Sequence, residues 1–112
     1  YIGEDNMAWV YLFIAGLLEI AWAIGLKYSQ GFTKLAFGIP TVVCMILSFF
    51  FLSIALRTLP IGTAYAVWTG IGAIGTALLG VILFGEPASM KRFICIGLIL
   101  AGVLGLRLGA TD

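Results

Sequence analysis

The sequence predicts an all-α membrane protein with four transmembrane helices. Hydrophobic residues make up 62% of the 112 residues, charged residues only 10%, and the mean hydropathy is +1.19. Soluble domains carry roughly a quarter charged residues, so a soluble fold could not cover its surface with this composition. The net charge of +1 gives no sign of nucleic-acid binding. The remaining charges gather in short segments between long apolar stretches, which indicates spanning helices joined by tight loops.

The first three apolar stretches are each long enough to cross a bilayer. They contain 19, 22 and 24 residues, with Glu19 as their single charge, and cover residues 8–26, 35–56 and 61–84. About 18 to 20 apolar residues suffice, because a helix rising ~1.5 Å per residue must cross a ~30 Å hydrocarbon core. Each stretch is therefore expected to form one spanning helix.

The fourth apolar stretch is short, running only from Phe93 to Leu106. We expect it to span as a helix over residues 88–107, with Pro87 opening the helix and with Lys91 and Arg92 extending to the interface at its start. A helix of this length is better placed in a protein contact than against lipid.

The spans form one domain over residues 7–110. We interpret Tyr1–Asn6 as an N-terminal extension or a cloning remnant, because the segment is polar and Met7 is a plausible native start. The connections between the spans leave no room for a soluble catalytic domain, so we expect no enzyme, no cofactor and no metal site. Cys44 and Cys95 both fall in apolar stretches and are interpreted as small buried hydrophobic residues rather than as a disulfide or metal pair.

The loops specify orientation only weakly. The first and third loops hold four basic residues and the opposite side holds two: Lys27, Lys34, Lys91 and Arg92 against Arg57 and Arg107. Basic residues favour the cytoplasmic side, so this small difference makes insertion in both orientations plausible.

Glu19 is the residue that the composition does not explain. A carboxylate in the middle of a spanning helix costs roughly 2.5–3.5 kcal/mol on insertion scales, and such residues usually mark ion or proton pathways. No Asp, Lys, Arg or His lies inside the other spans. Glu19 is therefore either protonated, or ionised and paired with a cation from outside the protein. Because the proton and the cation compete for one carboxylate, each can be exchanged for the other. The alternative is a neutral Glu19 that only hydrogen-bonds a neighbouring helix.

Aromatic and hydroxyl residues surround Glu19 at helical spacing or on the neighbouring spans. Gly16 and Trp22 lie three residues before and after it, on the same face of the helix. An aromatic face attracts cations, and an indole N–H can hydrogen-bond a carboxylate. Candidates on the other spans are Ser48, Tyr65 and Trp68. Each has an ordinary alternative as an interfacial aromatic or a self-bonded hydroxyl; as a group they favour a binding site.

Small residues indicate close helix packing. Gly97, Ala101 and Gly105 recur every four residues, which makes a smooth stripe for another helix. The pair Gly70 and Gly72 indicates either ordinary packing or a bend. Four helices can hardly enclose a polar pathway and shield it from lipid, so we expect at least a dimer that brings two copies of Glu19 together.

Three segments resemble the small multidrug resistance transporters: EIAWAIGLKYSQGFTKL (Glu19 to Leu35), LPIGTAYAVWTGIGAIG (Leu59 to Gly75) and GLILAGVLGL (Gly97 to Leu106). The resemblance covers Met7 to about Gly109. Trp22, three residues after the glutamate, favours the guanidinium-exporter subtype.

The resemblance implies a role for each of these positions. Glu19 would bind substrate and proton in alternation, and the residues that would line its site and hydrogen-bond the carboxylate are Trp22, Ser48, Tyr65 and Trp68. The hinge of the third helix would be Gly70 with Gly72, and the fourth helix would form the dimer. Members of the family work as antiparallel homodimers with dual topology. The Tyr1–Asn6 extension and the uneven loop charges depart from the family pattern.

The sequence thus leads to a proton-coupled exporter of guanidinium-type small cations, a multi-pass protein of a bacterial inner membrane. Three alternatives stay open. One is an exporter of quaternary ammonium or other lipophilic cations, which have no N–H to donate and would rely on aromatic faces. Another is a non-transporting membrane subunit with a structural Glu19, and the third is a passive channel.

Overall fold

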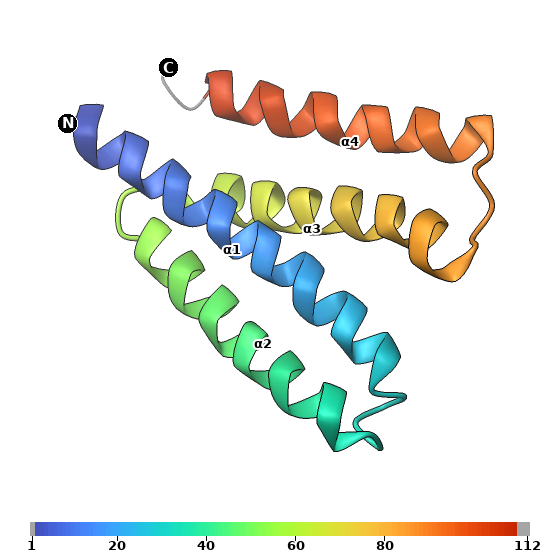
Figure 1. Cartoon of the computed structure of the whole chain (residues 1–112). Coiled ribbons are helices and arrows are strands. Elements are labelled where there is room, and N and C mark those ends of the chain that lie inside the picture. The colour runs from blue at the N-terminus through green and yellow to red at the C-terminus, as the bar shows by residue number, and fades with distance from the viewer. Residues whose placement is uncertain (1, 110–112) are drawn as a thin grey trace.

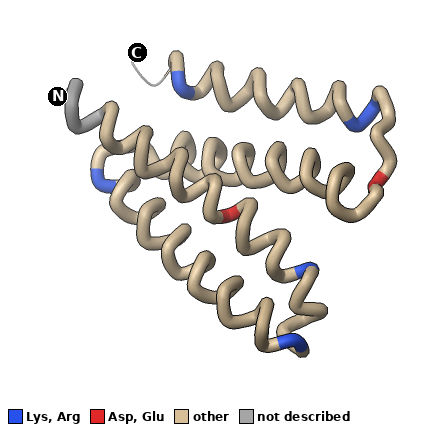
Figure 2. Tube along the Cα trace, viewed as in Figure 1, with Lys and Arg blue, Asp and Glu red and all other residues tan. Residues whose placement is uncertain are grey.

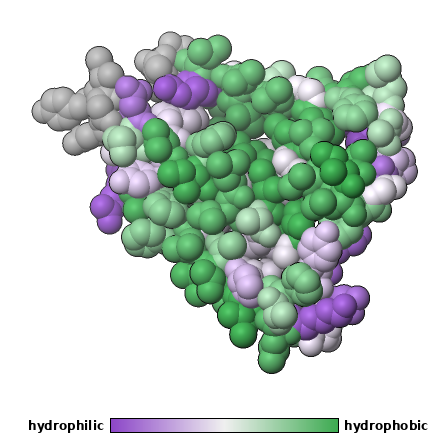
Figure 3. Space-filling view, in the orientation of Figure 1, coloured by the Kyte–Doolittle hydropathy of each residue, from purple (hydrophilic) through white to green (hydrophobic). Residues whose placement is uncertain are grey.

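The computed structural model describes residues 2–109, with side chains from residue 6 onward, and folds them into four helices (Figure 1). The helices are α1 (Ile2–Tyr28), α2 (Leu35–Ala55), α3 (Ile61–Phe84) and α4 (Met90–Gly109). All four are long and apolar enough to cross a membrane. The space-filling view shows a largely hydrophobic face, with hydrophilic residues near its edges (Figure 3). The four spans expected from the sequence are confirmed.

Two helix starts differ from the expected bounds, and the remaining helix boundaries lie within two residues of them. Helix α1 begins at Ile2 and thus includes residues of the segment that sequence analysis set apart as an extension. Helix α4 begins at Met90, two residues later than expected, because Ser89 caps it: the backbone N–H of Arg92 donates to Ser89 Oγ at 3.1 Å. Pro87 therefore precedes the helix and does not open it.

Helix α1 crosses the middle of the fold and packs against both α2 and α3 (Figure 1). The buried apolar residues come from these three helices and from Leu59 in the α2–α3 connection. They include Leu12 and Ala15 of α1, Ala55 of α2, and Ala64 and Val67 of α3. Gly85 ends α3 in a left-handed conformation with φ 65°, which a glycine adopts without steric cost.

Helix α4 lies along α3 and buries no residue of its own in the single chain. Its C-terminal end lies near the N-terminal part of α1 (Figure 1), where the guanidinium carbon of Arg107 is 4.7 Å from the centroid of the Trp9 ring. A short apolar helix was expected in a protein contact; here it contacts α3 on one side and leaves Leu98 and Leu104 exposed on others. Cys95 on the same helix is exposed, and Cys44 on α2 is half-buried, so the expected burial holds only in part; both thiols are free.

The single chain is a thin slab, with principal extents of 44 × 35 × 18 Å. Large apolar side chains are exposed on every helix, including Phe13 of α1, Ile46 of α2, Ile82 of α3 and Leu98 of α4. Every helix therefore has a face that no other part of the described chain covers. A pathway buried from lipid needs a further protein layer, which is consistent with the expected dimer.

Candidate functional site

Glu19 lies in the middle of α1, away from the helix ends where the basic residues gather (Figure 2). Its carboxylate lies directly against Gly72 of α3, so close that a Cβ at position 72 would overlap the carboxylate atoms. One turn earlier on α1, the buried Gly16 packs against the side chain of Ile71. The two helices approach closely at the level of Glu19 because glycines stand on both sides of the contact.

Two polar atoms near this contact are buried without a hydrogen-bond partner among the described residues. They are Glu19 Oε1 and, one turn along α1, Trp22 Nε1. The first is an acceptor and the second a donor. We expected the indole N–H to bond the carboxylate, yet in the single chain neither atom has a partner. A buried unpaired polar group is costly, so this pair of atoms calls for a ligand or a partner chain.

Ser48 and Trp68 form a buried hydrogen-bond chain that ends on α1. The indole N–H of Trp68 on α3 donates to Ser48 Oγ at 3.0 Å, and that hydroxyl donates to the backbone carbonyl of Ala15 at 2.7 Å. Ala15 lies four residues before Glu19, one turn away along α1. The network therefore ties α2 and α3 to the turn of α1 that precedes the carboxylate. In the single chain the hydroxyl bonds the helix backbone, and its expected bond to the Glu19 carboxylate stays a prediction.

Aromatic rings connect the remaining candidate residues. Phe49 on α2 lies between the two tryptophans, with ring centroids 6.4 Å from Trp22 and 5.7 Å from Trp68. Tyr65 packs against Trp68 at 5.7 Å and is 58% exposed. Phe49 was not among the residues predicted from the sequence, because it looks like any lipid-facing residue in a run of phenylalanines. Its one signal is its place directly after Ser48.

The structure brings together Glu19, Gly72 and Gly16, and joins Ser48, Trp68 and Tyr65 nearby. Helix α3 runs without a break through Gly70 and Gly72, and Gly70 packs against Val103 of α4. The hinge at these glycines stays a prediction. The stripe of Gly97, Ala101 and Gly105 is exposed in the single chain, and its role in dimerisation likewise stays a prediction.

Comparison with known proteins gives consistent matches along the chain. The family model described as Small Multidrug Resistance protein matches residues 7–99. A guanidinium exporter of Yersinia pseudotuberculosis is 61% identical over 104 residues, which cover 93% of this chain and all of that protein. Guanidinium exporters of Citrobacter freundii and of Salmonella typhimurium strain LT2 are 60% and 55% identical, over 91% and 93% of this chain and 97% and 99% of their own lengths. With four spanning helices and this match, the chain is a multi-pass membrane transporter of the small multidrug resistance family.

Proposed function

We propose that this protein exports guanidinium-type small cations in exchange for protons, with both ligands competing for Glu19. The observation that carries the proposal is the buried Oε1 of Glu19, an acceptor in the middle of a spanning helix that no described side chain or backbone group pairs. A carboxylate in that position is stable when it holds a proton or a cation. Because each ligand satisfies the same atoms, each leaves as the other arrives.

The surroundings of Glu19 suit a planar cation with N–H donors. Guanidinium presents its N–H groups in one plane and pairs with a carboxylate through two parallel hydrogen bonds. Trp22, one turn along α1, supplies an aromatic face for such a cation. The relatives that are 55–61% identical are named guanidinium exporters, which supports the same substrate class here. That relationship also supports a transporter rather than an enzyme.

The network beyond the carboxylate holds the site in shape. Trp68 donates to Ser48, which donates to the Ala15 carbonyl, so these two donors are already used within the chain. The carboxylate therefore keeps its acceptor sites for the exchanging ligands. Tyr65, packed against Trp68 with its ring tilted and largely exposed, is available to a ligand or to a second chain.

The working unit in this proposal is an antiparallel homodimer. The slab is only 18 Å in its short dimension, and the small-residue stripe on α4 is uncovered. A second copy packed through α4 would add the missing protein layer and bring a second Glu19. The weak charge difference between the loops supports insertion in both orientations. The bacterial sources of the relatives support an inner-membrane location.

The test is pH-driven transport in liposomes containing the purified protein. Guanidinium, a substituted guanidine and a tetraalkylammonium ion are offered separately across a proton gradient. The proposal predicts accumulation of guanidinium against its gradient and no response to the quaternary ion. Accumulation of the quaternary ion alone would instead identify a lipophilic-cation exporter. Guanidinium flux that follows its own gradient and ignores the proton gradient would identify a channel, and absence of all flux would favour a non-transporting subunit.

A further inference from the structure

A cavity of about 300 Å³ lies between α1 and α3 at the end of the fold that carries the α3–α4 connection. Its α1 wall includes Ala23 and Lys27, and its α3 wall includes Thr76 and Gly80. The far side is closed by two charged residues from beyond α3. None of the site residues predicted from the sequence lines this cavity.

The cavity lies on the same helix faces as the Glu19 site. On α1, Ala23 and Lys27 follow Glu19 at intervals of four residues, and on α3, Thr76 and Gly80 follow Gly72 in the same way. Residues four apart share a helix face, and eight residues advance along the axis by about 12 Å. The cavity therefore occupies the groove between Glu19 and the membrane surface at this end of the protein.

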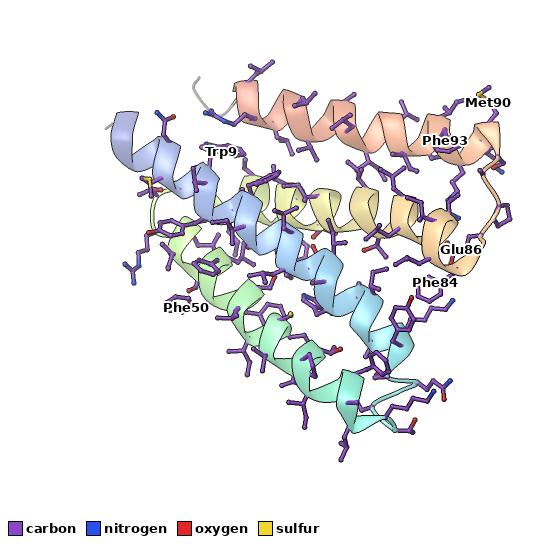
Figure 4. The ribbon with its side chains drawn as sticks, viewed as in Figure 1. Trp9, Phe50, Phe84, Glu86, Met90 and Phe93 are labelled. Atoms are coloured by element: carbon purple, nitrogen blue, oxygen red, sulfur yellow. The ribbon has the colours of Figure 1, made fainter. Side chains whose placement is uncertain are left out.

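The guanidinium of Arg92 occupies one side of this cavity. Its Nη2 donates to the carboxylate of Glu86 at 2.6 Å and to the backbone carbonyl of Ala77 at 2.8 Å. Figure 4 shows Glu86 in the connection that follows α3, beside Phe84 at the end of that helix. A carboxylate and a carbonyl thus converge on one nitrogen of a guanidinium.

The backbone of α3 is shaped to admit this pair. A Cβ at Gly80 would overlap the Glu86 carboxylate and stand 3.2 Å from Arg92 Nη2. The backbone N–H of Glu86 donates to the Gly80 carbonyl at 3.2 Å, which folds the connection back over the end of α3. The left-handed Gly85 makes that turn possible. The Ala77 carbonyl is therefore fixed in α3, and the connection that carries Glu86 is fixed by its own backbone bond to Gly80.

Arg92 uses little of its hydrogen-bonding capacity in the contact with Glu86 and the Ala77 carbonyl. Both hydrogen bonds of its guanidinium come from Nη2, while its Nε is buried with no hydrogen-bond partner among the described residues. The side chains of Arg92 and Glu86 are 26% and 36% exposed, so solvent ions reach the pair. A guanidinium offers five N–H donors in a fork that fits a carboxylate with two bonds. A free guanidinium ion can therefore form two hydrogen bonds with the Glu86 carboxylate, to which Arg92 donates one.

We infer that Glu86 and the Ala77 carbonyl form an outer guanidinium site on the route to Glu19, and that the Arg92 side chain occupies it until substrate displaces it. The inference rests on the proposed function, because it requires guanidinium to be the transported cation. The exchange breaks and forms only hydrogen bonds and ion pairs. The site selects for N–H donors before the cation reaches Glu19, since a quaternary ion cannot replace the hydrogen bonds that Arg92 gives up.

Lys27 keeps the outer site from trapping its cation. Its Nζ lies 4.7 Å from the centroid of the Phe84 ring, at the wall of the same cavity, and no carboxylate pairs with it in the described part of the chain. Its positive charge, together with that of the displaced Arg92, repels a bound cation. A site along a pathway must bind weakly enough to release its ion.

The test isolates the outer site by removing the inner carboxylate with Glu19→Gln. In that background, Arg92→Ala removes the side chain that occupies the outer site. Guanidinium binding is then measured by calorimetry on protein shown to be monodisperse. We expect saturable binding of guanidinium and none of tetramethylammonium. Adding Glu86→Gln should weaken guanidinium binding about tenfold or more, because the charged acceptor is lost. Absence of guanidinium binding to the Glu19→Gln, Arg92→Ala protein, or equal guanidinium affinity after Glu86→Gln, would overturn the inference.

A second measurement leaves Arg92 in place and so does not depend on the truncated variant. Nitrogen NMR of the arginine side chains in the Glu19→Gln protein, with Arg92 identified through Arg92→Lys, should show the Arg92 signal moving with added guanidinium and not with tetramethylammonium. An Arg92 signal that stays fixed contradicts displacement. Liposome transport by the unaltered protein separates the two ideas. Proton-driven guanidinium transport, together with no guanidinium binding at the outer site, rejects only this inference. Absence of guanidinium transport rejects the proposed function.

Discussion

The carboxylate of Glu19 lies against the backbone of Gly72, with no room between them for a β-carbon. Helices α1 and α3 thus pack closely at the one acidic residue inside a span. The contact fixes where the carboxylate stands, while its Oε1 has no hydrogen-bond partner in the described chain. A fixed position and an unpaired acceptor are what a site for exchanging cations requires.

Gly72→Ala should displace the carboxylate without unfolding the protein. The overlapping atoms belong to the flexible end of the Glu19 side chain, which can move aside. Misplacing a binding group by about 1 Å can reduce rates by up to about a hundredfold, so guanidinium exchange should fall at least tenfold. Gly62→Ala is the control, because a β-carbon there meets nothing within 4 Å. Unchanged exchange in Gly72→Ala would mean that the contact does not position the carboxylate.

Ser48→Ala should destabilise the fold because it breaks two buried hydrogen bonds at once. The Trp68 indole loses its acceptor and the Ala15 carbonyl loses its donor. We expect a loss of about 1–2 kcal/mol in the free energy of unfolding, measured in detergent. Ser53→Ala is the matched control on the same helix. Its hydroxyl is exposed and bonds only the carbonyl of Phe50, so its removal should cost less than about 0.5 kcal/mol.

The two tryptophans should respond differently to the loss of their N–H groups. Trp22→Phe removes a donor that has no partner in the single chain and keeps a ring against Phe49, so stability should hold while guanidinium affinity falls. Trp68→Phe breaks the bond to Ser48, so stability should fall by about 1 kcal/mol. Thermal unfolding and guanidinium binding, measured on both variants, check this contrast. Equal loss of stability in the two would show that Trp22 has a structural partner.

Bulky side chains on the α4 stripe should separate the dimer. Gly97→Leu places a large residue where the single chain leaves open space, so the fold of one chain should be unaffected. If the stripe packs against a second copy, dimer dissociation should become at least about tenfold easier, because close helix approach is lost. Gly102→Leu is the control, since position 102 is equally open but lies off the stripe. Energy transfer between labelled chains on dilution in lipid measures the difference, and identical curves would contradict a dimer through this stripe.

The sequence predicted the spans and the importance of Glu19 for one physical reason: bilayer insertion makes long apolar stretches and a buried charge conspicuous. It could not predict which side chains meet. These helices are apolar on every side, so periodicity does not assign their faces. The position of Phe49 between the tryptophans, the bond from Ser48 to Ala15 and the reach of Arg92 to Ala77 all depend on how the helices are rotated. The late start of α4 was missed because Ser89, not Pro87, caps it.

Proton-driven guanidinium exchange by Glu19→Gln in liposomes, beside Glu19→Asp and the unaltered protein, tests the exchange role of Glu19 most directly. The amide fills nearly the same space and keeps an acceptor, but it carries no charge to exchange. Glu19→Asp keeps the carboxylate on a shorter side chain and serves as the control for folding and insertion. We expect no exchange above empty liposomes for Glu19→Gln and measurable, slower exchange for Glu19→Asp, because a proton and guanidinium compete for the Glu19 carboxylate. Guanidinium accumulation by Glu19→Gln against a proton gradient would contradict that competition.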